Sequence, residues 1–214
     1  MVTHTSDATA IHKLTVSASM GSINISGGSL ALGSDSSFSI PLDLSGGTIS
    51  GPGNLAMASN APLNWSMGTI KGAGQVIAGG GITFSGGFTR VLDGRTLTIP
   101  ANVTTVMDSG PLYGYNGAVI NNYGSFNVTG DTSFVGVSGA TPIFNNNGTF
   151  TKSPTTGITY MYWAFNSPNG TTVNQQSGTL PCSAAAVRAT TSRWRRGPAS
   201  HSLAARTPFE TPPR

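Results

Sequence analysis

The chain has 214 residues, of which 29 are Gly and 13 are Pro, and charged side chains make up 8% of it, about a third of the share usual in soluble domains. Because 37% of the residues are apolar, the composition is sufficient for a folded core and excludes wholesale disorder. One cysteine, Cys182, and three histidines near the ends exclude a disulfide framework and a Cys/His zinc site within one copy.

The net charge of +4 comes entirely from the last part of the chain. Residues 1–180 hold five Lys or Arg against six Asp, which gives −1, whereas residues 181–214 hold six Arg against Glu210, which gives +5. A nearly neutral body lacks the positive surface that nucleic-acid binding needs, so we expect no nucleic-acid partner for it. Neither a signal peptide nor an apolar run of about 18 residues is visible, so no membrane span is expected.

Short β-strands are predicted along the body in chain order. Apolar and polar residues alternate at 14–20, 23–25, 30–32, 38–44 and 97–99, which is the period of a strand with one buried face. Gly-Gly, Gly-Pro-Gly and Asn-Gly separate these runs, because tight corners need positive φ angles that Gly adopts without steric cost. Helical periodicity is absent from the body, so each unit is interpreted as strand, corner, strand.

Internal repeats indicate how these units are arranged. Ser45–Leu55 matches Ser66–Val76 at an offset of 21, and Val119–Phe126 matches Ile143–Phe150 at an offset of 24. A weaker echo of the second repeat lies at Val173–Leu180. Because a period of about 20 to 30 residues is typical of stacked coils, the sequence predicts one β-solenoid of about seven coils over residues 1–180.

A short Gly-(Ser/Thr)-apolar kernel recurs through the body. Since neighbouring side chains alternate across a strand, its Ser or Thr should point outward and the apolar residue inward. Trp65 is also expected in the core. The kernel occurs at Gly28-Ser-Leu, Gly47-Thr-Ile, Gly68-Thr-Ile, Gly124-Ser-Phe, Gly148-Thr-Phe and Gly178-Thr-Leu, with a variant at Gly94-Arg-Thr-Leu97.

Two asparagine pairs recur at the same place in consecutive repeats: Asn121 with Asn122, and Asn145 with Asn146. Stacked Asn amides can hydrogen-bond along a ladder of neighbouring coils. Alternatively, Asn occurs there because it tolerates the left-handed backbone of a turn. Both interpretations give these residues a structural role.

The segments 46–55, 92–97 and 145–150 resemble repeats of large secreted bacterial β-helix proteins of the autotransporter-passenger and filamentous-haemagglutinin-like group. The resemblance covers residues 14–180 and implies a right-handed parallel β-helix at the cell surface or in the medium. It implies a structural or adhesive role, without catalysis, for a fragment of a longer solenoid. The alternative is a carbohydrate-active β-helix enzyme or a glycan-binding module.

Acidic residues are too sparse to support an active site. The body contains no Glu, and its six Asp occur singly, whereas sugar-cleaving enzymes use paired carboxylates. Asp108 and Asp131 are 23 residues apart and could stack one coil apart. Asp93 lies between Arg90 and Arg95, which we interpret as a local ion pair on the surface. We interpret the Asp residues otherwise as turn caps. We therefore predict no catalytic residue, no cofactor and no metal.

Exposed aromatic rings could form a binding site by stacking on the faces of sugar rings. If residues 160–165 form a strand, Tyr160 and Tyr162 share one face while Met161, Trp163 and Phe165 share the opposite face, which is the expected core. A second aromatic group follows Leu112. The candidate glycan-binding residues are Tyr113, Tyr115, Tyr160 and Tyr162.

The segment 181–214 differs from the body, because it is rich in Arg and Pro and loses the strand pattern. We consider three interpretations: a disordered linker, a basic arm for nucleic acid or anionic surfaces, and translation out of frame. Moving the frame back by one nucleotide at Pro181 permits Thr-Leu-Gln-Arg-Gly-Gly, which would restore the alternation. The coding DNA decides between frameshift and the other two.

No polar cap is apparent at either end of the repeat region. Uncapped solenoid ends present open strand edges that pair with other chains. We therefore expect self-association through the ends of the solenoid, in addition to surface glycans as candidate partners.

Overall fold

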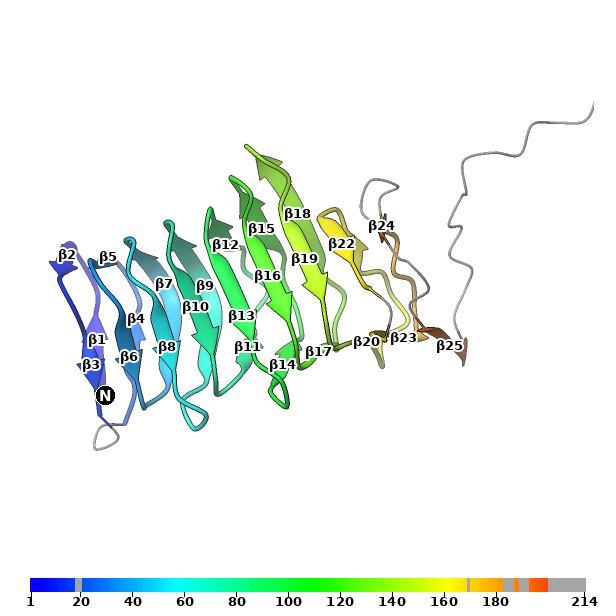
Figure 1. Cartoon of the computed structure of the whole chain (residues 1–214), viewed down its shortest axis with the longest axis horizontal. Coiled ribbons are helices and arrows are strands. Elements are labelled where there is room, and N and C mark those ends of the chain that lie inside the picture. Colours follow the sequence, from blue (N-terminus) through cyan, green and yellow to red (C-terminus); the bar gives the residue numbers. More distant parts are fainter. Residues whose placement is uncertain (18–20, 169, 183–186, 189–192, 200–214) are drawn as a thin grey trace, which may run out of the picture.

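A computed structural model describes residues 1–17, 21–168, 170–182, 187–188 and 193–199, the last two segments as backbone only. The described chain is all-β and forms a parallel solenoid of about eight turns, which confirms the predicted fold class with one turn more than expected. Figure 1 shows the strands side by side along the long axis of the molecule, with the N-terminus at one end.

Most turns contain three strands, and the strands of successive turns stack into three faces. Face 1 and face 2 belong to one sheet, because two long strands, β7 (Leu42–Ser50) and β9 (Leu63–Lys71), bend around the corner between them. Besides the first halves of β7 and β9, face 1 consists of β1 (Val2–His4), β4 (Ile23–Ile25), β11 (Ile82–Phe84), β14 (Thr104–Met107), β17 (Ser125–Val128), β20 (Thr149–Lys152), β23 (Thr172–Ser177) and β25 (Arg193–Ala199).

Face 2 follows face 1 in every turn, and face 3 closes the turn. Besides the second halves of β7 and β9, face 2 consists of β2 (Ala8–Ile11), β5 (Ser29–Leu32), β12 (Arg90–Asp93), β15 (Leu112–Tyr115), β18 (Ser133–Ser138) and β21 (Tyr160–Met161). Face 3 is a separate sheet of β3 (Thr15–Val16), β6 (Ser36–Phe38), β8 (Leu55–Met57), β10 (Gln75–Ala78), β13 (Thr96–Ile99), β16 (Val119–Asn122), β19 (Ile143–Asn146), β22 (Ala164–Asn166) and β24 (Val187–Arg188).

The strand register confirms the two strong repeats. Ile49 pairs with Ile70 and Val119 pairs with Ile143, at the offsets of 21 and 24 read from the sequence. The predicted third copy of this repeat at Val173–Leu180 is wrong. Val173 pairs with Phe150 on face 1, whereas Val119 and Ile143 lie on face 3. The kernel at Gly178 lies instead beside face 2, where Thr179 bridges to Ile158.

The kernel side chains point as predicted, with Ser or Thr outward and the apolar residue buried. Its place in the turn is not constant, however. The kernels at Gly28, Gly47 and Gly68 enter face 2, the variant at Gly94 enters face 3, and those at Gly124 and Gly148 enter face 1. The kernel therefore marks a corner of the solenoid, not one position of a repeat.

The interior is one continuous hydrophobic cluster whose buried residues run from Val16 to Leu180. Aromatic rings stack through its later turns: those of Phe126 and Phe150 are 5.8 Å apart and nearly parallel, at 7°. Trp163 is fully buried, as predicted, because Gly114 leaves space for it. A Cβ atom at position 114 would lie 2.6 Å from the Trp163 ring.

Two asparagine ladders run between turns and decide between the two interpretations of these residues. On the inner side of face 3, Asn122 donates to Asn146 at 2.9 Å, and both side chains are fully buried. On the outside, Asn145 donates to Asn121 at 2.9 Å and Asn166 continues the row by donating to Asn145 at 2.8 Å. None of these five residues has a positive φ, so the ladder and not turn tolerance explains them.

Arg90 is buried at the corner between faces 1 and 2. Here β11 and β12 are separate strands, whereas β7 and β9 run continuously around the same corner in earlier turns. Arg90 points inward in register with Gly68 and Leu112. Its guanidinium donates to backbone carbonyls from three turns: those of Trp65 (2.7 Å), Ser85 (2.5 Å), Gly86 (2.8 Å), Ser109 (2.8 Å) and Gly110 (3.4 Å).

Arg95 likewise donates to backbone carbonyls, at the corner between faces 2 and 3. It is fully buried and donates to the carbonyls of Gly51 (2.8 Å), Gly53 (2.5 Å), Lys71 (3.1 Å) and Gln75 (3.4 Å). Burial lowers the pKa of both guanidinium groups. The predicted surface ion pair with Asp93 is therefore wrong: Asp93 accepts a hydrogen bond of 2.7 Å from Asn116.

The first turn leaves one side of its strands unpaired among the described residues. A mainly apolar depression of about 370 Å³ opens there between Val2, Leu14, Val16 and Ile23. Self-association stays a prediction: we expect oligomers by light scattering at roughly tens of micromolar, the range in which exposed edges associate. Val2→Lys, which places a charge at this edge, should reduce association, and a monomeric wild-type chain would contradict it.

Two strands lie beyond residue 180. β24 pairs with β22 and β25 pairs with β23, both parallel. Residues 183–186, 189–192 and 200–214 of the predicted tail lie outside the described residues. The division at residue 180 and the origin of the tail therefore stay predictions.

Candidate functional site

Two exposed tyrosines form a ridge on the outer side of face 2. Tyr160 begins β21, Tyr162 directly follows it, and buried Met161 lies between them, so both rings project from the same side. The ring centroids are 5.5 Å apart and the ring planes differ by 4°. Their side chains are 39% and 52% exposed. This pair is called the tyrosine ridge below.

A shallow groove of about 310 Å³ lies beside Tyr160. The strand register builds it, because Ser133 on β18 pairs with Tyr160 while Tyr113 on β15 pairs with Val135. Tyr113 is half-buried and forms one wall. The groove is lined by Gly110, Pro111, Tyr113, Asp131, Thr132, Ser133, Ile158 and Tyr160.

A second depression of about 240 Å³ lies beside Tyr162, over the end of β18 and the chain between β18 and β19. It is lined by residues 136–142 and by Tyr162. Tyr115 lines neither depression and is half-buried beside Asp93 and Ser138. Of the four candidate glycan-binding tyrosines, the structure therefore brings Tyr113, Tyr160 and Tyr162 together and leaves Tyr115 apart.

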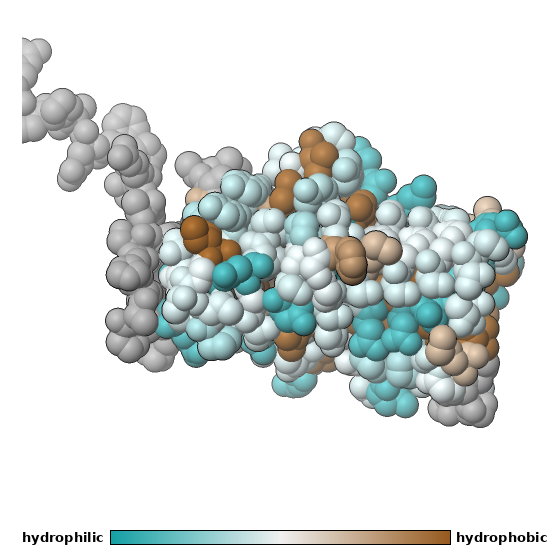
Figure 2. Space-filling view, turned by 180° about the vertical axis from the view of Figure 1, so that it is seen from behind, coloured by the Kyte–Doolittle hydropathy of each residue, from teal (hydrophilic) through white to brown (hydrophobic). Residues whose placement is uncertain are grey.

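On the face of the described chain that Figure 2 shows, the apolar residues form small, separate patches. Figure 2 shows separate brown residues on a mostly pale and teal face. Two of the exposed apolar residues, Val137 and Ile158, lie at the second depression and at the groove respectively. Scattered exposed residues of this kind are normal, so the ridge and its depressions are distinguished by their geometry.

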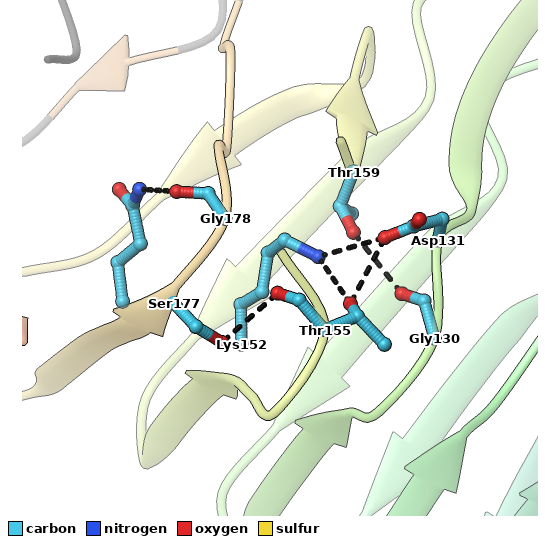
Figure 3. A network of polar contacts seen from close by, with 8 residues as sticks. Gly130, Asp131, Lys152, Thr155, Thr159, Ser177 and Gly178 are labelled. Atoms are coloured by element: carbon cyan, nitrogen blue, oxygen red, sulfur yellow. Dashed lines mark hydrogen bonds and ion pairs between the residues drawn. The ribbon is translucent and has the colours of Figure 1, made fainter. Parts of the chain in front are cut away.

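Asp131 at the edge of the groove is held by a polar network at the corner between faces 1 and 2 (Figure 3). Lys152 reaches Asp131 Oδ1 at 3.4 Å and the Thr155 hydroxyl at 3.1 Å, and that hydroxyl donates to Asp131 Oδ1 at 2.9 Å. The Lys152 side chain is fully buried, whereas that of Asp131 is 54% exposed. Ser177, in the next turn, donates to the Thr155 carbonyl at 2.9 Å and so links that turn to the network.

Lys152 is buried because it occupies a core position. It ends β20 in register with Val128 on β17, so its stem lies in the row of inward-facing apolar residues. Burial lowers the pKa of its ammonium group below the ordinary 10.5, and the nearby Asp131 carboxylate opposes this shift. An inward position two residues after Phe150 in an alternating strand was the sequence signal that could have revealed this lysine.

Asp131→Asn should destabilise the fold, because it leaves a buried ammonium without its carboxylate. The loss should lie between the ~1 kcal/mol of exposed ion pairs and the ~3–5 kcal/mol of fully buried ones, since only one partner is buried. Chemical denaturation measures it. In a Lys152→Met background the Asp131→Asn change should have almost no effect, and equal effects in both backgrounds would contradict the pairing.

The lowered pKa of Lys152 also predicts a pH dependence. The charged form is penalised in the folded state, so stability should rise with pH between the lowered folded pKa and 10.5, the unfolded value. The measured quantity is the unfolding free energy of the wild type minus that of Lys152→Met. Burial raises the pKa of Cys182 to about 12, so the stability of the wild type and of the variant should both fall above pH 9. Because both proteins contain Cys182, this effect cancels in the difference. A flat difference would contradict the prediction.

Asp35 and Asp108 each accept a hydrogen bond from another residue of the fold. Asp108 and Asp131 do not pair with each other: Asp108 accepts from Ser109 at 2.6 Å, while Asp131 contacts Lys152 and Thr155. Asp35 accepts from the backbone N–H of Asn54 at 3.0 Å, which links two successive turns and is not a local turn cap, so the predicted turn-capping role is not seen for this residue. Within the described part of the chain no group of three or more His, Cys, Asp or Glu is placed to hold a metal ion.

No protein-family model, no curated protein and no solved structure matches this chain. The β-helix part of the resemblance found in the sequence is supported by the fold, and its secreted, surface-exposed part stays a prediction. No helix among the described residues is long and apolar enough to cross a membrane.

Proposed function

We propose that this chain is a structural or adhesive segment of a cell-surface or secreted β-helix protein, without catalysis. The observation that carries the proposal is the unbroken hydrophobic interior, which runs through the stack from Val16 to Leu180. A solenoid of this kind is a rigid spacer whose outer faces are its contact surfaces. The extended row of turns in Figure 1 suits a stalk.

The polar residues of the interior support the same role. Arg90, Arg95 and the Asn122–Asn146 ladder hydrogen-bond to the backbone or to equivalent side chains of other turns. All four side chains are fully buried, so they stabilise the stack and cannot reach a substrate. The export and surface location of the chain are proposed from the resemblance alone.

Glycan binding is the second candidate function, and the tyrosine ridge favours it. The ridge presents flat, exposed rings beside a groove that contains a carboxylate. A sugar-cleaving enzyme of the alternative class would need a second acid or base there. Asp131 is the only carboxylate among the residues that line the groove, so this site supports binding without cleavage.

A glycan array combined with a polysaccharide-cleavage screen on the full chain tests the proposal. A purely structural segment should give no signal in either assay, and an adhesive segment should bind without cleaving. Release of new chain ends from a polysaccharide, abolished by Asp131→Asn, would overturn the proposal in favour of an enzyme. The Asp108→Asn variant is the matched control, because Asp108 lies in the preceding turn and outside the groove.

A further inference from the structure

We propose that the tyrosine ridge binds a neutral oligosaccharide at two subsites, one on each side. This inference rests on the adhesive form of the proposed function and adds the ligand class and the place. Tyr160 lines only the groove and Tyr162 lines only the second depression, so the stacked pair separates them. Each subsite therefore has its own aromatic face.

Size and shape favour single sugar rings. The groove of about 310 Å³ and the depression of about 240 Å³ lie at or below the lower end of small-molecule pockets. A pyranose ring has an apolar face of C–H groups, which carry a slight positive charge, and the face of a tyrosine ring is slightly negative. Stacking one ring on each outer tyrosine face matches both the shape and the charge.

The first subsite has a hydrogen-bond acceptor at Asp131 Oδ2, which lies beside Gly157. The Lys152 and Thr155 contacts of Asp131 are both to Oδ1, and no described residue donates to Oδ2. A carboxylate oxygen has two acceptor positions, so Oδ2 can accept hydrogen bonds from sugar hydroxyls. The second subsite offers polar groups of its own from Ser138 and Thr141.

Charge decides between neutral and acidic glycans. The residues that line the groove include a carboxylate and no cation, and Lys152, which contacts that carboxylate, is fully buried. Uronate, sialate or sulfate groups would meet a negative charge there without a positive partner among the lining residues. The site therefore fits uncharged hexose chains.

Calorimetry on the full chain with cellohexaose, mannohexaose and acidic hexagalacturonate tests the inference. We expect a neutral hexaose to bind and its monosaccharide to bind at least tenfold more weakly, because a single ring occupies one subsite. Tyr160→Ala and Tyr162→Ala should each weaken binding about tenfold or more, and Tyr160→Phe should retain it. Melting temperatures should stay unchanged, since both rings are exposed.

Tyr123→Ala is the matched control, because Tyr123 is 49% exposed and does not line either subsite. Binding that survives Tyr160→Ala and Tyr162→Ala would overturn the site while leaving an adhesive function. Preference for hexagalacturonate would overturn the neutral class. Absence of binding to both neutral hexaoses at millimolar concentration would overturn the inference and leave the structural form of the proposed function.

Discussion

Replacing Arg90 with methionine is expected to lower the free energy of unfolding by about 4 kcal/mol or more. The Arg90 side chain is fully buried, and its guanidinium serves carbonyl groups of three turns at once. Methionine fills much of the volume but donates no hydrogen bond, and each buried carbonyl left unpaired costs roughly 1–3 kcal/mol. The loss should therefore exceed that of an ordinary core substitution.

Urea denaturation measures this loss, and amide hydrogen exchange locates it at the corner between faces 1 and 2. Arg90→Lys should recover only part of the stability, because one ammonium group cannot reproduce the planar fork of the guanidinium. Lys71→Met is the matched control, since it also removes one positive charge but at an exposed position, and we expect a change within about 0.5 kcal/mol. A similar small change for Arg90→Met would show that the carbonyls find other partners.

Ile70→Ala should cost about 2–5 kcal/mol, because it opens a cavity in the stacked core. Ile70 is fully buried on β9 and lies between Ile49 of the preceding turn and Leu92 of the following turn. Both neighbours are fixed by strand pairing on either side of β9, so we expect the cavity to collapse only in part.

The adjacent Thr69→Ala is the internal control. Thr69 points outward from the same strand and is only partly buried, so its loss should cost less than about 1 kcal/mol. Thermal unfolding of the two variants compares inward and outward positions without changing the strand. Equal shifts in melting temperature would contradict the orientation of the kernel.

Local pattern was sufficient to predict the scaffold. Alternating residues identify strands with one buried face, and glycines identify the corners. The repeats at offsets of 21 and 24 identify strand pairs that the structure contains, including Ile49 with Ile70. Trp65 and Phe165 were placed in the core by alternation alone, and both are buried. These features follow from sequence because they depend on neighbours along the chain or on strong internal similarity.

The candidate site needed the contacts between turns. Pairing partners lie from 19 residues apart, as in Ile23 with Leu42, to 27 apart, as in Ser133 with Tyr160. A shift of one residue between turns would reverse which side chains face outward. The sequence identified Tyr113 and Tyr160 as candidates, but only the register places them on one groove with Asp131.

The buried cations show most clearly which features need the contacts between turns. Arg90 and Lys152 each occupy an inward position of an alternating strand, which the sequence contains. Whether such a residue turns outward or stays buried depends on the free carbonyls and the carboxylate that neighbouring turns bring to it. Those groups come from residues up to 25 positions away, such as Trp65 for Arg90. The sequence by itself thus determined the strands, corners and main repeats, and the tertiary structure decided the charges inside and the site outside, because both depend on non-local contacts.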